Sequence, residues 1–319
     1  MPFEIRHVSL AAVDAADLTF RLAPPRNVEA LAASIARLGL LCPPILAGTD
    51  EPWTVVSGFG RVAACRSLGW KKMPARRPRE AADLWRCAQW AVAEKAAERP
   101  LEALAAARAL RLLRRFAPDE KVFGRTVRSF GLPDQPAAQS RMEALCSLPE
   151  AIQAALSDGT LAVPTAISLG RMPLEAAGQV VGMLVEMRFG LNKQREVVTL
   201  LEEIARREGI SLEAVLAAPE LKTLAEGTDT DRAQRGQRLR AYLYQRRFPA
   251  LSKAQRRFED LSRQLCPDTG AQLTPPPGFE SRAFQLNLTF SSRSELERHR
   301  ETLRRLISHP NLDEIFRLA

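Results

Sequence analysis

Apolar and polar positions first divide the chain at about residue 80. Before that point, the apolar runs EIRHVSLAAV, PPILAG and PWTVVSG alternate with a helical repeat, which is typical of a small α/β unit. In the segment NVEALAASIARLG, Asn27 can cap a helix and Gly39 can end it. The apolar positions between them repeat at helical spacing: Val28, Leu31, Ile35 and Leu38. After PWTVVSG, the turn GFGR leads into a second helix that ends near Gly69.

From Glu80 to about Arg207 the pattern is helical throughout. Ala, Leu and Arg recur at helical spacing between short turns that carry Gly or Pro, such as FAPDE, FGLPDQP and SDGT. Such a pattern predicts a compact domain of five or more short helices, without strands.

The remainder is less regular. Residues 209–227 show weak periodicity and are expected to be a connection, and a basic helical region follows from about Asp231 to Leu265. Beyond the proline-rich break LTPPPGFES, the run RAFQLNLTF predicts a strand and SSRSELERHRETLRRLI predicts a serine-capped helix. The apolar side of the strand carries Phe284, Leu286, Leu288 and Phe290, and the apolar side of the helix carries Leu296, Leu303 and Leu306. One strand and one helix cannot bury both faces alone, so a second copy of the chain is expected to cover them.

These patterns predict an α+β chain of several domains, as its length of 319 residues also suggests. The expected divisions are an α/β domain over 1–95, a helical domain over 96–208, a linker over 209–231, and a basic helical region with a dimerisation unit over 232–319. Arginines interrupt the longest apolar runs, so we expect no membrane span, no secretory signal and a cytosolic protein.

Cysteine and histidine usage argues against a metal centre. The five cysteines are scattered and never form a CxxC pair, and there are only three histidines. We therefore expect no zinc site, no catalytic thiol and mostly buried, reduced cysteines, with Cys65 as a small hydrophobe on the helix after the turn.

The net charge of +9 is concentrated in two stretches. Between Arg61 and Arg79 there are seven cations and no acid, and between Arg232 and Cys266 ten cations face only Glu259 and Asp260. Such clusters favour a polyanionic partner, although a solvated arginine-rich surface would show the same pattern.

The segment DEKVFGRTVRSFGLPDQPAAQSRMEALCSLPE predicts a helix-turn-helix. A first helix spans about Asp119 to Phe130, Gly131 permits the turn, and Asp134 is expected to cap a second helix with Pro136 in its first turn. The second helix has an apolar back and a polar front, as a recognition helix requires. The back is Ala138, Met142 and Leu145; the front is Gln135, Gln139, Ser140 and Glu143, with Arg141 at its margin.

Basic residues near this segment are expected to reach phosphates: Arg125, Arg128, Lys193 and Arg195. Two helices joined by a glycine turn also occur in proteins that never touch DNA, so that alternative stays open at this point.

The order of these parts resembles the ParB family of partition proteins. PPRNVEALAASIARLGLLCPPIL and WTVVSGFGRVAACRSLGWKKMPA resemble the ParB/sulfiredoxin-like N-terminal domain. CSLPEAIQAALSDGTLAVPTAISL resembles the helix-turn-helix core, and AFQLNLTFSSRSELERHRETLRRL resembles the dimerisation unit. The resemblance implies a homodimer that binds double-stranded DNA and works with a partition ATPase.

The resemblance also implies CTP and Mg²⁺ at the N-terminal turn. Gly58 and Arg61 match the ends of the family's GERR box, and Arg26 and Gly60 are further candidates for nucleotide contact. Phe59 and Gly60 replace its acid and first arginine, Cys42 replaces a glutamine, and Ala63 a later arginine. The family's EN..R box has no clear counterpart, although Glu94 and Arg99 lie near its place. These losses predict weaker triphosphate binding and slow hydrolysis, so the chain is at most a weak CTPase.

This chain lacks the residues that two other chemistries of related domains require. Sulfiredoxin has its reactive cysteine where this chain has Phe59, and a nuclease would need clustered acids that the turn region lacks.

The main hypothesis is a ParB-like, sequence-specific DNA-binding protein in chromosome or plasmid segregation, associated with the nucleoid. Specificity is expected from Gln135, Gln139, Ser140 and Arg141, and non-specific affinity from Arg256 and Arg257. The alternatives are a CTP-operated DNA clamp with slow CTP hydrolysis, and a transcriptional regulator that has lost nucleotide binding.

Overall fold

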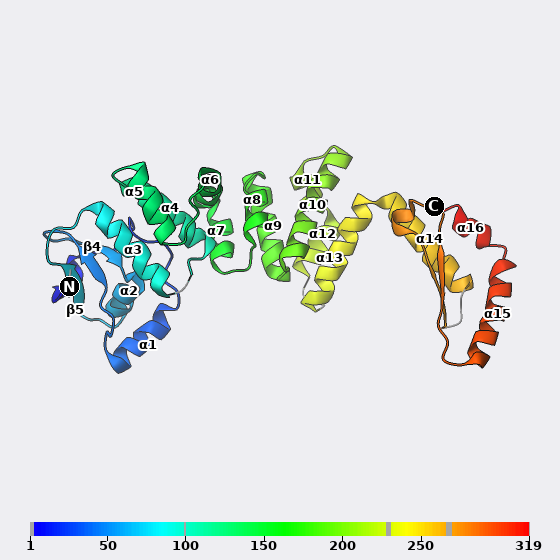
Figure 1. The fold of residues 1–319 in the computed structure, drawn as a ribbon, viewed down its shortest axis with the longest axis horizontal. Coiled ribbons are helices and arrows are strands. Elements are labelled where there is room, and N and C mark those ends of the chain that lie inside the picture. The colour runs from blue at the N-terminus through cyan, green and yellow to red at the C-terminus, as the bar shows by residue number, and fades with distance from the viewer. Residues whose placement is uncertain (1–2, 99, 228–230, 266–269, 319) are drawn as a thin grey trace. The chain divides into compact units, whose positions relative to one another are not determined.

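The computed structural model describes residues 3–98, 100–227, 231–265 and 270–318 (Figure 1). It is an α+β chain, as the sequence predicts, and it divides into two compact units. We call Met1–Gln194 the N-terminal unit and Arg195–Ala319 the C-terminal unit.

The N-terminal unit contains a mixed sheet in the order β1-β5-β3-β4-β2. The strands are β1 (Phe3–Ser9), β2 (Val13–Asp14), β3 (Ile45–Ala47), β4 (Trp53–Ser57) and β5 (Lys72–Pro78). β1 pairs with β5, and β3 with β4, in antiparallel register, whereas β3–β5 and β2–β4 are parallel. β5 is absent from the sequence-based prediction because its polar residues outnumber its buried ones, Met73 and Ala75.

Helices cover both faces of this sheet, which explains its short, almost wholly apolar central strands. On one face Leu46 and Val55 pack with α1 (Val28–Leu38) and α2 (Phe59–Ser67). On the other face Ile45 and Val56 pack with α3 (Leu84–Glu98) and α4 (Ala103–Phe116). In α1 the predicted cap is confirmed, since the Asn27 side chain accepts a hydrogen bond from the Ala30 amide.

One residue of the expected packing face of α1 is not buried. Leu38 is 53% exposed, because it lies in the last turn of the helix, beyond the buried Ile35.

The sheet and the first helices share a core with the helical part. A single buried cluster joins Val56 of the sheet, Cys87 of α3, Leu113 of α4 and Phe123 of α5 (Glu120–Ser129). The expected division at residue 95 therefore falls inside a compact unit rather than between two. The remaining helices of the N-terminal unit are α6 (Pro136–Glu143), α7 (Glu150–Ser157), α8 (Val163–Leu169), α9 (Leu174–Met187) and the start of α10 (Leu191–Glu208), with a 3-10 turn η2 (Ala144–Ser147).

The C-terminal unit continues α10 and is also largely helical. Residues 209–231, expected to be a linker, carry α11 (Leu212–Leu216) and α12 (Pro219–Glu226), and Leu221 of α12 is fully buried. The basic helical region forms α13 (Arg232–Arg247) and α14 (Pro249–Leu265). Three buried apolar residues, Val215, Leu216 and Leu221, anchor the short helices α11 and α12. So few apolar positions produce no long helical repeat in the sequence, which is why residues 209–231 were expected to be a linker.

The C-terminal part holds a two-stranded antiparallel sheet of β6 (Ala271–Thr274) and β7 (Gln285–Leu288), followed by α15 (Arg293–Ile307) and α16 (Leu312–Phe316). β7 and α15 confirm the predicted strand and helix, and the Ser292 side chain caps α15. β6 was not predicted. Phe284 lies against Phe258 and Phe316, with ring centroids 6.0 and 5.6 Å apart, so the strand has an internal partner in the same unit.

Among the described residues, no helix has the length and apolar character that crossing a membrane requires.

Candidate functional site

The turn between β4 and α2 is shaped by Gly58. This residue has φ of 92°, and a Cβ atom there would lie 2.8 Å from the Cβ of Pro44, so only glycine fits. α2 then begins at Phe59, which directs the free amides of its first turn outward from the strand end. Cys65 is fully buried on α2 and burial raises the pKa of its thiol, as expected of a small hydrophobe.

A cavity of about 250 Å³ opens over this turn. All four predicted nucleotide-contact residues line it: Arg26, Gly58, Gly60 and Arg61. Lys95 of α3 also lines it and was not predicted, because nothing in the sequence places α3 beside the turn. Two arginines, one lysine and a helix N-terminus at one cavity form an arrangement suited to an anion of high charge.

Contacts within the N-terminal unit hold the two arginines in place. Arg61 donates to the carbonyl oxygen of Cys42 at 2.8 Å and lies 3.3 Å from a carboxylate oxygen of Glu94. Arg26 makes a bidentate pair with Glu102 at 3.0 and 2.9 Å and also donates to the carbonyl of Ser157. The cations are therefore positioned before any ligand arrives, which lowers the entropic cost of binding.

Glu94 is the carboxylate next to this cavity. Its Oε1 accepts from both Arg61 and Arg76, whereas its Oε2 is buried and has no hydrogen-bond partner among the described residues. Mg²⁺ commonly binds through one or two protein carboxylates together with phosphate oxygens, so Glu94 fits that role. The described residues contain no group of three or more His, Cys, Asp or Glu side chains that could hold a metal ion by themselves. Arg99, noted with Glu94 in the sequence, lies outside the described residues.

The predicted pair of helices and its turn are present as α5 and α6. Asp119 caps α5 by accepting from the Val122 amide at 2.8 Å, and Gly131 adopts φ of 66° in the turn. The cap of α6 is Gln135 rather than Asp134, and its side chain makes no capping hydrogen bond. Because Pro136 occupies the first helical position, the preceding residue is restricted to an extended conformation and becomes the cap.

Gln139 does not belong to the polar front of α6. It is only 4% exposed; its Oε1 accepts from Arg114 at 2.6 Å and its Nε2 donates to the Pro133 carbonyl at 2.9 Å. Residue 139 lies three positions before Met142 and therefore on the same side of the helix, which α4 covers. Glu143 likewise pairs with Arg114, at 3.1 Å. Gln139 and Glu143 therefore lie on the covered side of α6 and not on its expected polar front, because the covered side is wider than the apolar stripe.

The exposed side of α6 keeps the other predicted residues. Gln135, Ser140 and Arg141 are exposed, and the Arg141 guanidinium donates to the Ala137 carbonyl of the same helix at 3.1 Å. Of the predicted phosphate contacts, Arg125 on α5 and Lys193 and Arg195 on α10 are also exposed.

Gln194, which lies between Lys193 and Arg195, is buried, and its side chain hydrogen-bonds to the surrounding backbone. It donates to Thr160 and Phe189 at 2.8 and 2.7 Å and accepts from the Ala162 amide at 3.0 Å. These bonds tie the start of α10 to the segments around Thr160 and Phe189.

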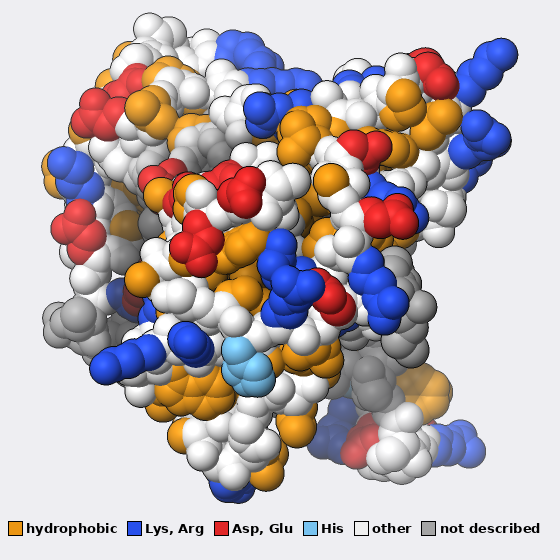
Figure 2. All heavy atoms as spheres, turned by 90° about the vertical axis from the view of Figure 1, so that its left-hand side faces the viewer, with side chains coloured by type: hydrophobic (Ala, Val, Ile, Leu, Met, Phe, Trp, Pro, Cys, Tyr) orange, Lys and Arg blue, Asp and Glu red, His pale blue; other side chains and the backbone are white. Residues whose placement is uncertain are grey.

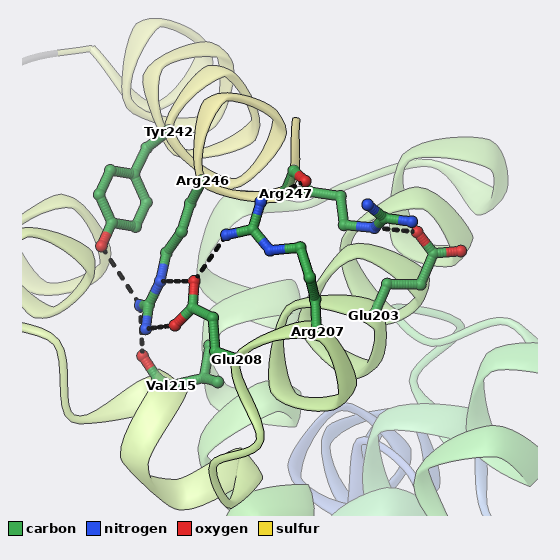
Figure 3. A network of polar contacts seen from close by, with 7 residues as sticks. All are labelled: Glu203, Arg207, Glu208, Val215, Tyr242, Arg246 and Arg247. Carbon is green, nitrogen blue, oxygen red and sulfur yellow. Dashed lines mark hydrogen bonds and ion pairs between the residues drawn. The ribbon is translucent and has the colours of Figure 1, made fainter. Parts of the chain in front are cut away.

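Three of the six arginines of α13 bind acids of α10 rather than face solvent as free cations. Figure 3 shows Arg246 held by both oxygens of Glu208, and Arg247 paired with Glu203 at 2.7 Å. Arg240 pairs with Glu196 at 2.6 Å. Hydrogen bonding from Arg246 lowers the pKa of Glu208. The sequence showed cations without neighbouring acids because the acids come from a helix about forty residues earlier.

The two arginines predicted to give non-specific affinity lie on α14. Arg256 is exposed and donates to Gln245, and Arg257 forms a bidentate pair with Glu314 at 2.6 and 2.7 Å. The ion pair between Arg257 and Glu314 must therefore break before Arg257 can bind a phosphate.

The basic stretch from Arg61 to Arg79 is also largely engaged. Arg66 donates to two backbone carbonyls, Arg77 stacks on the Trp53 ring at 3.7 Å, and Arg76 pairs with Glu94. On the face of the molecule seen in Figure 2, basic side chains are interspersed with acidic and hydrophobic ones and do not form one continuous patch.

Comparison with known proteins gives solved structures only: no family model and no curated protein matches the chain. The chain is similar to the C-terminally truncated chromosome-partitioning protein ParB from Caulobacter crescentus, solved with CTP-gamma-S. The identity is 19%, the coverage 57% of this chain and 99% of that one, and the TM-score 0.27.

The same Caulobacter crescentus protein complexed to the centromeric parS site matches at 18% identity, with coverage of 61% and 98% and a TM-score of 0.31. A Pnob8-like ParB-N domain matches at 15% identity, with coverage of 76% and 97% and a TM-score of 0.38. ParB structures are thus what the chain is similar to, as the sequence resemblance led us to expect. At such low TM-scores, the ligands of this chain must be argued from its own residues.

Proposed function

We propose that the chain is a sequence-specific DNA-binding protein of the ParB type, which acts on nucleoid DNA in the cytoplasm during chromosome or plasmid segregation. The observation that carries the proposal is the exposed side of α6. This side presents Gln135, Ser140 and Arg141, while the buried Gln139 on its other side, and Leu145 of the following η2, pack on the body of the N-terminal unit. Short hydroxyl and amide groups with one arginine suit base edges in a major groove. Exposed Arg125 on the neighbouring helix suits a flanking phosphate.

The test is selection of duplexes from a randomised library with the full chain. We expect the parent to enrich one sequence and the variant Ser140→Ala/Arg141→Ala to enrich none, because each lost base contact costs about 1–3 kcal/mol of discrimination. Arg171→Ala is the matched control, since this arginine is exposed in the turn between α8 and α9. A parent that enriches no sequence, or a double variant that enriches the same one, would contradict the proposal.

The cavity over Gly58 favours a second function for the same chain, that of a nucleotide-operated switch. Arg26, Arg61 and Lys95 would hold the triphosphate of CTP, the amides of α2 would meet one phosphate, and Glu94 would bind its Mg²⁺. Mg²⁺ would neutralise phosphate charge. Arg61 and Glu94 contact each other, so an incoming phosphate would compete for Arg61 and could free the carboxylate for the metal. Any CTP hydrolysis is expected to be slow, because Phe59 and Gly60 supply no charged group to the turn.

Isothermal titration with CTP and MgCl₂ tests the switch. A Cβ at Gly60 would lie 3.5 Å from Leu31 and 3.6 Å from Pro25, an ordinary contact, so Gly60→Ala keeps the fold and narrows the cavity. We expect this variant to bind CTP at least tenfold more weakly and Arg61→Ala to bind it about a hundredfold more weakly. The absence of binding heat with the parent would leave only the DNA-binding function.

We also infer that two copies join through the C-terminal unit. Apolar side chains remain exposed after β7 and on α15, with Phe290 51%, Leu296 45% and Ile307 70% exposed. A β-strand edge and an apolar helix face are both covered when a second copy pairs in two-fold symmetry. Light scattering should give twice the mass of the chain, and Leu296→Lys/Ile307→Lys should give a monomer. In segregation the dimer would engage a partition ATPase, and a strain that lacks the chain should lose the DNA it partitions.

A further inference from the structure

A second cavity in the N-terminal unit is lined by five arginines. It has a volume of about 430 Å³, and its arginines are Arg21, Arg108, Arg111, Arg114 and Arg115. None of them was singled out from the sequence, and none belongs to the Gly58 cavity or to the exposed side of α6. We call this space the arginine cavity.

Helical spacing explains why the arginines meet. Arg108, Arg111 and Arg115 lie at positions i, i+3 and i+7 of α4 and therefore project from one side of that helix. Arg21 comes from the segment before α1, and the carbonyl of its neighbour Leu22 accepts from Arg108 at 3.3 Å. The fold thus places Arg21 opposite a row of three cations.

Acids neutralise only part of this charge. Arg114 is paired, with Glu143 at 3.1 Å and Glu120 at 3.2 Å. Arg108 donates to neutral acceptors, the Leu22 carbonyl and Gln153. Within the part of the chain that the structure describes, Arg21, Arg111 and Arg115 form no ion pair with a carboxylate.

Two other groups feel the charge of the row. The Cys146 thiol lies against Arg111; burial holds the pKa of this thiol above its ordinary value, and the contact with Arg111 offsets only part of that rise. Asp17 feels the charge of Arg115 from a longer range: burial alone would raise the pKa of its carboxyl, but Thr19, Thr54 and then Arg115 hold it below the ordinary value. The arginine cavity therefore keeps a positive excess.

Burial lowers the pKa of Arg108; the Cys146 thiol opposes this shift in part, and the charge of Arg21 lowers the pKa further. Like charges that acids neutralise only in part raise the free energy of the empty cavity, and an anion that enters removes that repulsion.

We propose that the arginine cavity is a phosphate-binding site separate from the Gly58 cavity. Guanidinium forks match phosphate oxygens in bidentate geometry, and several forks around one space favour a ligand with more than one phosphate. Glu143 and Cys146 in its lining come from the end of α6 and from η2, so a bound phosphate would sit at the C-terminal end of the helix with the exposed DNA-facing side. The phosphates can belong to a DNA backbone or to a free polyphosphate anion, and both have the same chemistry.

The first experiment uses inorganic triphosphate and the unmodified full chain. Mass spectrometry follows alkylation of Cys146, the half-buried thiol of the arginine cavity. Bound triphosphate should slow this alkylation, both by covering the sulfur and by opposing thiolate formation. An alkylation rate of Cys146 that saturating triphosphate leaves unchanged would overturn the proposal.

The second experiment assigns the site to its arginines and separates the two sources. Arg111→Gln/Arg115→Gln alters two exposed arginines without breaking an ion pair, and Arg37→Gln/Arg171→Gln is the charge-matched control. In calorimetry the first variant should lose at least about a hundredfold in triphosphate affinity at one site, and the control should lose none. Equal affinities in the two variants would contradict the assignment.

The salt dependence of binding to a duplex without a cognate site then shows whether the bound phosphates belong to the DNA backbone or to a free polyphosphate anion. If the ligand is the DNA backbone, the slope of log K against log salt should fall by about 1.8 in the arginine-cavity variant, about 0.9 for each lost phosphate contact. An unchanged slope together with lost triphosphate binding identifies a free polyphosphate anion as the ligand. CTP binding at the Gly58 cavity should persist in this variant, so the two sites can fail independently.

Discussion

Gln139 offers the sharpest test of how the α5–α6 pair of helices is built. The sequence pattern assigns it to base recognition, whereas the structure places it between α4 and the loop before α6, with 4% of its surface exposed. Replacing it by alanine should therefore lower the stability of the N-terminal unit and leave the exposed side of α6 unchanged.

The magnitude follows from the two hydrogen bonds that are lost. The bond from Arg114 to Oε1, at 2.6 Å, is charge-assisted and contributes about 1.5–3 kcal/mol, but the Arg114 side chain is 39% exposed, so the lower end applies. The Pro133 carbonyl, which accepts from Nε2 at 2.9 Å, loses its partner at a further cost of about 1 kcal/mol. We expect Gln139→Ala to lower the free energy of unfolding by about 2–3 kcal/mol.

For a unit of this size, that loss corresponds to a decrease in Tm of about 4–12 °C. Urea unfolding followed by circular dichroism, in the presence and absence of the selected duplex, gives both quantities. Gln135→Ala is the matched control, since Gln135 is exposed and its side chain makes no capping bond. It should change stability by less than about 0.5 kcal/mol.

Three outcomes discriminate between the two roles. A destabilised Gln139→Ala that still discriminates its DNA site at low temperature supports the structural role. A double-mutant cycle with Arg114→Met should give a coupling free energy of at least about 1 kcal/mol. A Gln139→Ala variant of parental stability that has lost discrimination would refute the reasoning and return Gln139 to the DNA interface.

Three further predictions concern the turn, the α10–α13 network and α14. Gly58→Ala should lower the free energy of unfolding by about 1–3 kcal/mol, measured in urea, because its φ is 92° and the added Cβ meets a proline at 2.8 Å; a parental value would contradict the steric argument. The hydrogen bond from Arg246 lowers the pKa of Glu208 from 4.5, so its stabilisation is present above that pH and lost as pH falls through the lower folded-state value. Glu208→Gln should accordingly show less loss of stability than the parent between about pH 5 and pH 3, and parallel curves would exclude this contribution. Glu314→Gln should release Arg257 and steepen the salt dependence of non-specific DNA binding by about 0.9 in slope, and an unchanged slope would remove Arg257 from the DNA interface.

Local signals predicted those parts of the candidate site that depend on neighbouring residues. Glycines at 58 and 131 mark turns with positive φ, and Asp119 and Ser292 cap the helices that follow them, as their sequence contexts suggested. Gly58, Gly60 and Arg61 are close in sequence, so their meeting at one cavity required only the turn. Arg26 and Lys95 join them from other elements, and only the resemblance to ParB suggested Arg26.

The strands show the same limit. β3 and β4 are apolar enough to be recognised alone, whereas β5 and β6 are strands because of their partners, β1 and β3 for β5 and β7 for β6. A polar strand at a sheet is stabilised by ladder hydrogen bonds that no local pattern records.

By itself, the sequence determined many of the helices and turns, although not α11 and α12, that the chain is α+β, and which residues can act as cations and breaks. These properties follow from backbone sterics and from periodicity, which act over a few residues. Only the tertiary structure decided that Gln139 is buried, that Arg247 is paired with Glu203, and that Arg21 faces Arg111 and Arg115 across one cavity. Burial and charge neutralisation depend on atoms brought from distant parts of the chain, and the free energy of a polar side chain is set by those atoms.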